Sequence, residues 1–194
     1  MTSLAGGLAD PVHDAQRQFR DLLHAMSHPG TVVPLRGMLP PAPAPLATAT
    51  YALLLGLADH ETRLWIDGEH RDARASLRFH TGAGWVQDPA DASFAVVAEG
   101  GDLPPLDQFG QGDPDYPDRS STVFLQVARF GHGQTLHLAG PGIDGRACLQ
   151  VDGVPADFGA MLRANRSRFP QGVDLVLVAG ATIACLPRSI QVEG

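Results

Sequence analysis

The chain has 194 residues, a formal net charge of -7 at pH 7, and 44% hydrophobic residues. These values predict one domain over residues 1–194 with a substantial core, and they argue against a nucleic-acid-binding protein because no basic patch dominates. All 14 basic residues are arginine and none is lysine, which excludes a pyridoxal phosphate Schiff base and a phosphate-loop lysine.

The first predicted element is an amphipathic helix that begins at Asp10-Pro11 and ends at Ser27-His28-Pro29-Gly30. Asp10 suits the capping position, and Pro11 suits the first helical position. Apolar residues at helical spacing predict its buried face, namely Val12, Ala15, Phe19, Leu22, Leu23 and Met26. A strand over residues 31–35 and a Pro-rich surface connection over residues 38–45 are expected to follow.

The middle of the chain alternates predicted helices and strands. A buried helix over residues 46–58 precedes a strand over 63–66, and a polar-faced helix over 69–77 precedes a strand over 94–98. Residues 100–121 are rich in Gly and Pro and predict a long loop with one helical turn. Such a loop is either functional or disordered.

The second half predicts a hairpin of strands 122–128 and 135–139 around Gly131-His132-Gly133. A helix capped by Asp157 is expected to run to Arg166, and an apolar strand to run over residues 173–179. A short return strand with Cys185 follows. The interleaved elements predict an α/β fold, with a mixed β-sheet flanked by helices.

Arg78, His80 and Arg188 are the candidate substrate-binding residues. An arginine fork and a histidine donor could hold a phosphonate or a triphosphate. The alternatives are structural: Arg78 at a helix end, His80 packed under the sheet, and Arg188 paired with Asp174 or another carboxylate.

Three other motifs are weaker candidates for a functional site. His24 and His28 are four apart, a spacing that suits metal ligands, but no third ligand is evident and a helix-end role is favoured. Gly140-Pro141-Gly142 is either an anion cradle or, as favoured, a plain turn. Ser120 and Ser121 lack the GxSxG pattern of a serine hydrolase. No catalytic residue and no metal site are therefore assigned.

Cys148 and Cys185 show no CxxC spacing and are expected to be reduced residues of a cytoplasmic protein. No signal peptide and no run of membrane-spanning length are apparent in the sequence. We therefore expect neither a disulfide nor a membrane anchor.

Several short segments carry a resemblance to a known family. They are Asp14-Ala15-Gln16, Phe19-Arg20, Met26-Ser27-His28-Pro29-Gly30, Leu57-Ala58-Asp59, Leu77-Arg78-Phe79-His80-Thr81, Gly140-Pro141-Gly142-Ile143, Phe169-Pro170-Gln171-Gly172-Val173-Asp174 and Leu186-Pro187-Arg188. In order and extent, they resemble the H subunit of the bacterial carbon–phosphorus lyase core complex, which breaks down phosphonates. Residues 100–118 fall outside the resemblance, and Ser189-Ile190 follows the closing arginine where hydroxyl residues are expected.

The resemblance implies a fold similar to the large domain of pyridoxal-phosphate-dependent transferases, without the cofactor site. It also implies a homodimer when the chain is isolated, and a place beside subunits G, I and J in the complex. With G, I and an ATP-binding-cassette-type subunit L, the H subunit supports attack of a phosphonate on ribose C1′ of ATP. Adenine leaves, which gives α-D-ribose 1-phosphonate 5-triphosphate.

The resemblance attributes this catalysis to subunit I, so it implies an accessory subunit with no activity alone and no cofactor. ATP is then a substrate of the complex. The alternative is a stand-alone nucleotide- or phosphonate-binding α/β enzyme that uses Arg78, His80 and Arg188.

Overall fold

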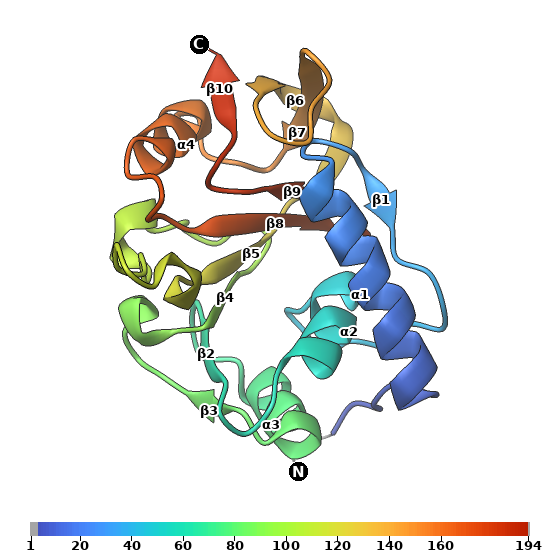
Figure 1. Cartoon of the computed structure of the whole chain (residues 1–194). Helices are drawn as coiled ribbons and strands as arrows, with labels where there is room; N and C mark the ends of the chain where they lie inside the picture. The colour runs from blue at the N-terminus through green and yellow to red at the C-terminus, as the bar shows by residue number, and fades with distance from the viewer. Residues whose placement is uncertain (1–3, 194) are drawn as a thin grey trace.

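The computed structural model describes residues 4–193 as an α/β fold with two sheets (Figure 1). The larger sheet has seven strands in the order β1-β9-β8-β5-β4-β2-β3. Their bounds are β1 (Val33–Pro34), β2 (Arg63–Ile66), β3 (Gly84–Trp85), β4 (Phe94–Val97), β5 (Thr122–Gln126), β8 (Asp174–Ala179) and β9 (Thr182–Leu186). Strands β3, β2, β4, β5 and β8 run parallel, and β9 runs antiparallel to β8 and β1. The predicted mixed sheet is confirmed.

Three helices cover one face of this sheet: α1 (Pro11–Ser27), α2 (Thr48–Leu57) and α3 (Arg71–Thr81). Helix α2 is buried over most of its length, as its apolar sequence predicts. The core on this face combines helix and strand residues, among them Leu22, Leu53, Leu77, Leu64, Val96, Phe124, Val176 and Cys185. Alternate residues of the central strands therefore point toward the helices.

A second sheet and a fourth helix cover the other face. The sheet has three antiparallel strands in the order β10-β6-β7, with β6 (Arg129–Ala139), β7 (Ala147–Asp152) and β10 (Gln191–Glu193), and the helix is α4 (Phe158–Arg166). In Figure 1 they lie at the opposite end of the molecule from α3. Core residues here include Val123, Leu125, Leu175, Leu177, Leu136, Leu138, Leu149, Val151, Phe158 and Leu162. Helices thus flank the sheet on one side, whereas a small sheet and one helix flank it on the other.

The predicted hairpin of residues 122–128 and 135–139 is wrong. Strand β5 is a buried central strand that pairs with β4 and β8, whereas β6 pairs with β7 and β10 in the other sheet. The Gly131-His132-Gly133 segment lies inside β6, where the register shifts between Phe130 and Gln134. A glycine pair with positive φ produces an irregularity in one strand here rather than a turn between two.

The predicted buried face of α1 is only partly correct: Leu22 is buried and Met26 packs against the core, but three of the predicted residues are exposed. The buried residues of this helix are Asp14, Gln18, Asp21, Leu22 and Ala25. Val12, Phe19 and Leu23 are 63%, 48% and 50% exposed. The helix is therefore turned so that a polar stripe faces the protein and part of its apolar stripe faces outward.

The loop over residues 100–121 contains two short 3-10 turns, η2 (Leu106–Gln108) and η3 (Pro117–Arg119), where one helical turn was expected. Leu106 and Phe109 are buried in the core beside α4 and the larger sheet, so the loop packs onto the fold. In the region from residue 4 to residue 193, no helix combines the length and apolar character needed to cross a bilayer.

Candidate functional site

Protein groups already bind the side chain of Arg188. Its backbone N–H and its Nε donate to Asp174 Oδ1 at 2.8 and 3.1 Å, and its terminal nitrogens donate to Asp174 Oδ2 and to the Pro117 carbonyl oxygen. The side chain is 14% exposed. The pairing of Arg188 with Asp174, which the structural alternative requires, is present. Arg188 ties the end of β9 to the start of β8 and to the loop over residues 100–121.

The segment that precedes β8 joins α4 to the same loop. The Asn165 side chain donates to the Val173 carbonyl oxygen and accepts from the Val173 N–H, both at 2.9 Å. The Gly172 N–H donates to the Gln111 carbonyl oxygen at 3.1 Å. The loop over residues 100–121 is thus hydrogen-bonded to the C-terminal part of the fold.

The turn at Gly140-Pro141-Gly142 packs against the end of α1. Gly142 has φ +84°, and a Cβ there would overlap the Ser27 carbonyl oxygen. Gly30 lies so close to the β6 side chain of Leu138 that a Cβ would be 2.7 Å from Leu138 Cδ1. Two segments that carry the resemblance therefore meet at a close packing contact, and the plain-turn interpretation is the one that this contact supports.

Arg78 and His80 lie on the exposed last turn of α3. His80 Nε2 is 2.9 Å from the Ala5 carbonyl oxygen, to which it donates in the matching tautomer, and its ring meets Phe79 edge-on at 5.0 Å between centroids. Within residues 4–193, Arg78 has neither an ion pair nor a side-chain hydrogen bond. His80 holds the N-terminal segment, while the guanidinium of Arg78 faces solvent.

The structure separates the three candidate residues. His80 lines a hollow with Gly7, Leu8, Pro11 and Leu55. Arg188 lines a different one, beside η3 and Phe169, at the edge where the parallel strands begin. Arg78 and His80 lie on the same turn of α3, whereas Arg188 lines a separate hollow. The three residues therefore do not form one site.

The carboxyl ends of the parallel strands are bridged by the protein's own side chains. Open α/β sheets usually bind ligands at this edge. Here Asp67 follows β2 and its Oδ1 accepts from the Ala98 N–H after β4 at 2.9 Å. Gln126 at the end of β5 accepts from the Ala47 N–H and donates to the Pro45 carbonyl oxygen. These contacts join strands and connections at the edge.

His24 and His28 pack together at the end of α1, with ring centroids 4.3 Å apart. His28 Nδ1 lies 3.0 Å from the His24 carbonyl oxygen, so His28 contributes to the helix end. Among residues 4–193 no group of three or more His, Cys, Asp or Glu side chains is arranged to hold a metal ion.

Both cysteines are free thiols. Cys148 is exposed on β7, whereas Cys185 is buried in β9. Burial raises the pKa of the Cys185 thiol far above its usual range, with a smaller contribution from Asp174. Since the thiolate is the reactive form, Cys185 is a core residue rather than a nucleophile.

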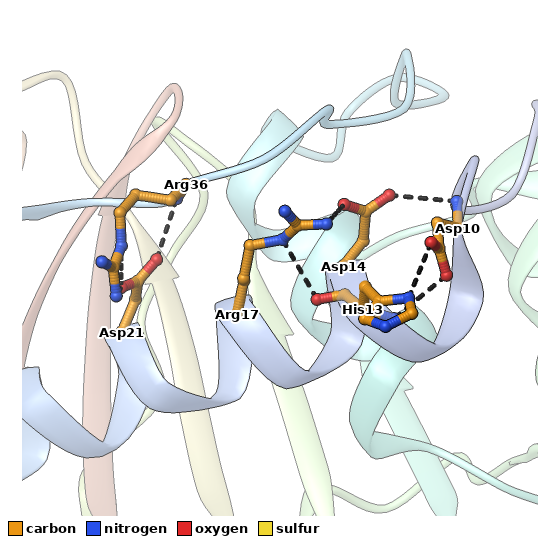
Figure 2. Close-up of polar contacts among 6 residues, drawn as sticks. All are labelled: Asp10, His13, Asp14, Arg17, Asp21 and Arg36. Atoms are coloured by element: carbon orange, nitrogen blue, oxygen red, sulfur yellow. Dashed lines mark hydrogen bonds and ion pairs between the residues drawn. The ribbon is translucent and has the colours of Figure 1, made fainter.

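The polar stripe of α1 holds a neighbouring loop (Figure 2). Asp21 is 2% exposed, and its carboxylate accepts from the Arg36 N–H at 2.8 Å and from Arg36 Nε at 2.7 Å. The Asp21 carboxylate raises the pKa of the Arg36 guanidinium still further. A buried carboxylate is tolerated here because backbone and guanidinium donors satisfy it.

At the start of α1, two carboxylates cap the helix reciprocally (Figure 2). Asp10 accepts from the His13 N–H at 3.1 Å, while Asp14 accepts from the Asp10 N–H at 3.1 Å. Arg17 lies 3.4 Å from Asp14 Oδ1. Asp14 and Asp21 are thus buried and bonded to protein groups. This orientation of the helix explains why its buried face differs from the predicted one.

The sequence contained a signal for this orientation. Asp10, Asp14, Gln18 and Asp21 follow one another at three- or four-residue spacing, as residues on one side of a helix do. Carboxylates usually lie on the solvent side of a helix, so apolar spacing alone predicts a different face. Arg36, the partner of Asp21, follows a β-strand outside the helix, and no local pattern predicts that pairing.

A family model and two relatives with known names all match this chain over most of its length. A family model described as bacterial phosphonate metabolism protein (PhnH) matches residues 6–193. The chain is 39% identical over 191 residues, covering 97% of this chain and 95% of the relative, to the alpha-D-ribose 1-methylphosphonate 5-triphosphate synthase subunit PhnH of Rhizobium meliloti (strain 1021). It is 33% identical over 182 residues, covering 92% and 85%, to the putative C-P lyase subunit protein HtxG of Stutzerimonas stutzeri.

Proposed function

The chain belongs to the PhnH family of bacterial phosphonate metabolism proteins, and from this membership we propose that it is an accessory subunit of the carbon–phosphorus lyase complex in organophosphonate catabolism. The match to the family along residues 6–193 carries the proposal. The name of the Rhizobium relative, a subunit of a ribose 1-methylphosphonate 5-triphosphate synthase, supports it further.

Within that complex, the chain supports displacement of adenine from ATP by a phosphonate, together with subunits G, I and L. The product is α-D-ribose 1-phosphonate 5-triphosphate. ATP and the phosphonate are substrates of the complex, and this chain holds no cofactor of its own. The polar contacts of Arg188, Asn165 and Asp21, each directed at protein groups, favour a supporting role over a catalytic one.

The proposal includes three finer expectations. The fold resembles the large domain of pyridoxal-phosphate-dependent transferases, and the absence of lysine from the chain fits the lack of that cofactor. The isolated chain forms a homodimer. The complex, which joins this chain to subunits G, I and J, works in the cytoplasm, where free thiols such as Cys148 stay reduced.

Co-elution tests the central proposal. The chain is co-expressed with subunits G, I and J of the same organism and passed over a sizing column. We expect one stoichiometric complex that contains all four chains. Separate elution of this chain from an otherwise assembled complex would contradict an accessory-subunit role.

A second candidate function rests on the free guanidinium of Arg78 beside His80. The isolated chain would then bind ATP or a phosphonate through these residues, with or without Arg188. Calorimetry with ATP tests it, using Arg78→Ala and Arg188→Ala separately. Binding by the wild-type chain that disappears in Arg78→Ala would favour this function. Under the accessory proposal, we expect no ATP binding by the isolated chain.

A further inference from the structure

Residues 4–9 form an irregular segment, here called the strap, that lies against the C-terminal half of α3. The Ala5 N–H donates to Ser76 Oγ at 3.0 Å, and the Ala5 carbonyl oxygen lies 2.9 Å from His80 Nε2, which donates to it in the matching tautomer. Ser76 and His80 are four residues apart, so they lie on one side of the helix. Figure 1 shows the chain passing beside α3 before it enters α1.

The strap faces both ring nitrogens of His80. Nε2 is bonded to the Ala5 carbonyl oxygen, and a Cβ added at Gly7 would lie 3.1 Å from Nδ1. Ser76 beneath the strap is 0% exposed. Since an imidazole binds ligands and moves protons only through its nitrogens, a ligand of His80 has to displace the strap.

Few contacts hold the strap in place. Among residues 4–193, the two bonds of Ala5 are the only hydrogen bonds of the strap. Leu4 is 46% exposed, and a Cβ at Gly6 would meet nothing within 4 Å. Leu8 and Leu55 line an open hollow between the strap and α2. A segment with so few buried contacts opens locally at low free energy, and the backbone entropy that it regains favours opening.

The neighbouring elements have supports that do not involve the strap. At the start of α1, Asp10 accepts from the His13 N–H, and Asp14 accepts from the Asp10 N–H. On α3, Ala73 and Leu77 pack into the core below the helix. Opening of the strap can therefore stop before Asp10 and leave both helices in place.

We propose that the strap opens independently of the rest of the fold and controls access to His80. In the closed form, the Ala5 peptide group occupies the hydrogen-bonding positions of Ser76 and His80. In the open form, a hydroxyl group and an imidazole become available together to a ligand with hydrogen-bond acceptors. If the chain binds an anion through His80, the strap must open first. This inference concerns the isolated chain and does not rest on the accessory-subunit proposal.

Two adjacent glycines offer a matched pair of variants in the full chain. Neither Gly6 nor Gly7 has a positive φ, so alanine fits the backbone at both positions. Gly7→Ala places a methyl group against the His80 ring, whereas Gly6→Ala places one in open space. Ser76→Ala loosens the strap in a second way, because it removes the acceptor of the Ala5 N–H. Thermal melts by circular dichroism check that all three variants fold.

Two rates report on opening. The first is exchange of the Ala5 N–H with solvent, followed by NMR. In the wild-type chain it should exceed the exchange of the β8 amides and stay constant in low urea, because local opening exposes little surface. The second is modification of the His80 ring by diethyl pyrocarbonate, followed by mass spectrometry. We expect Gly7→Ala and Ser76→Ala to raise both rates about tenfold, and Gly6→Ala to stay within about twofold of the wild-type chain.

Two results would overturn the inference. If the Ala5 N–H exchanges with the same rate and urea dependence as the β8 amides, the strap opens only when the whole chain unfolds. If His80 reacts equally fast in Gly7→Ala and Gly6→Ala, the strap does not control access to the imidazole. Neither measurement uses another subunit, so failure of the co-elution experiment would bear on the proposed function alone.

Discussion

Single polar side chains in this protein mostly fix backbone segments to one another. Arg188 binds the Pro117 carbonyl oxygen as well as Asp174, and Asn165 binds both backbone groups of Val173. The sequence offered Asp174, or another carboxylate, as the structural alternative for Arg188. It did not predict Pro117, since that residue lies in a loop with no periodic pattern.

Gln18 is the exception among the buried polar residues of α1. It is 1% exposed, and neither end of its amide has a hydrogen-bond partner within residues 4–193. It lines a small hollow between α1 and α2 together with Leu53 and Gly56. An unpaired buried amide is costly, so we expect Gln18→Met, which keeps the length of the side chain, to raise the free energy of unfolding by about 1 kcal/mol.

Asn165→Leu is the matched control, since it removes a buried amide that has both of its bonds to Val173. Urea denaturation should show a loss of about 2 kcal/mol, because two buried backbone groups lose their partners. Equal destabilisation by Gln18→Met and Asn165→Leu would mean that the Gln18 amide is satisfied in solution.

At the scale of elements, the strands over residues 63–66 and 173–179 and the helices near α1, α2 and α4 were predicted close to their observed bounds. Their apolar periodicity is a local property, as is the Asp10 cap of α1, whereas Asp157 precedes α4 without the predicted side-chain cap bond. Strand pairing is not local: the sequence around Gly131 fits a turn as well as it fits a bulge, and burial in two different sheets decides between them. Strand β7 was not predicted, and it too is defined by its pairing with β6 rather than by a local pattern.

The N-terminal cap of α1 predicts a pH dependence. The bond from the His13 N–H, followed by the His13 imidazole, lowers the pKa of Asp10 below 3.8. A carboxyl group whose folded pKa is lowered stabilises the fold above its unfolded pKa, and this stability is lost as pH falls through the folded value. We therefore expect Asp10→Ala to melt at a lower temperature than the wild-type chain at pH 7, with the difference shrinking below pH 3.8.

Asp10→Asn provides the comparison, because asparagine caps helices without a titrating carboxyl group. Melting curves followed by circular dichroism between pH 7 and pH 3 should show that its advantage over Asp10→Ala changes little with pH. A constant difference between the wild-type chain and Asp10→Ala down to pH 3 would contradict the titration of this cap.

At the scale of the whole molecule, the larger sheet separates two different layers, three helices on one face and a small sheet with α4 on the other. The segments Ser27-His28-Pro29-Gly30 and Gly140-Pro141-Gly142 lie where these layers meet. The sequence marked both segments through the resemblance, but their contact spans more than a hundred residues of chain and could not be predicted from either one.

This contact predicts a large effect of a small substitution. Gly142 has φ +84°, and a Cβ would overlap the Ser27 carbonyl oxygen and lie 2.9 Å from Pro29 Cδ. Gly145, with φ +71° and open space around it, is the control. In urea denaturation we expect Gly145→Ala to lose about 1 kcal/mol through backbone strain alone. Gly142→Ala should lose about 3 kcal/mol, because strain and overlap add. An equal loss of unfolding free energy in the two variants would show that the contact between Gly142 and Ser27 can relax.

The first and last thirds of the chain also meet directly, and this has a consequence for the order of events during synthesis. The Gly30 N–H donates to the Cys185 carbonyl oxygen, Val33 pairs with Ile183, and the Leu35 N–H donates to the Ala181 carbonyl oxygen. A nascent chain on the ribosome cannot form these bonds until residues 181–185 have emerged from the exit tunnel. The support beneath α1 is therefore completed only after the last third of the sequence has been synthesised, so α1 cannot be held in its final position while the first third alone has emerged.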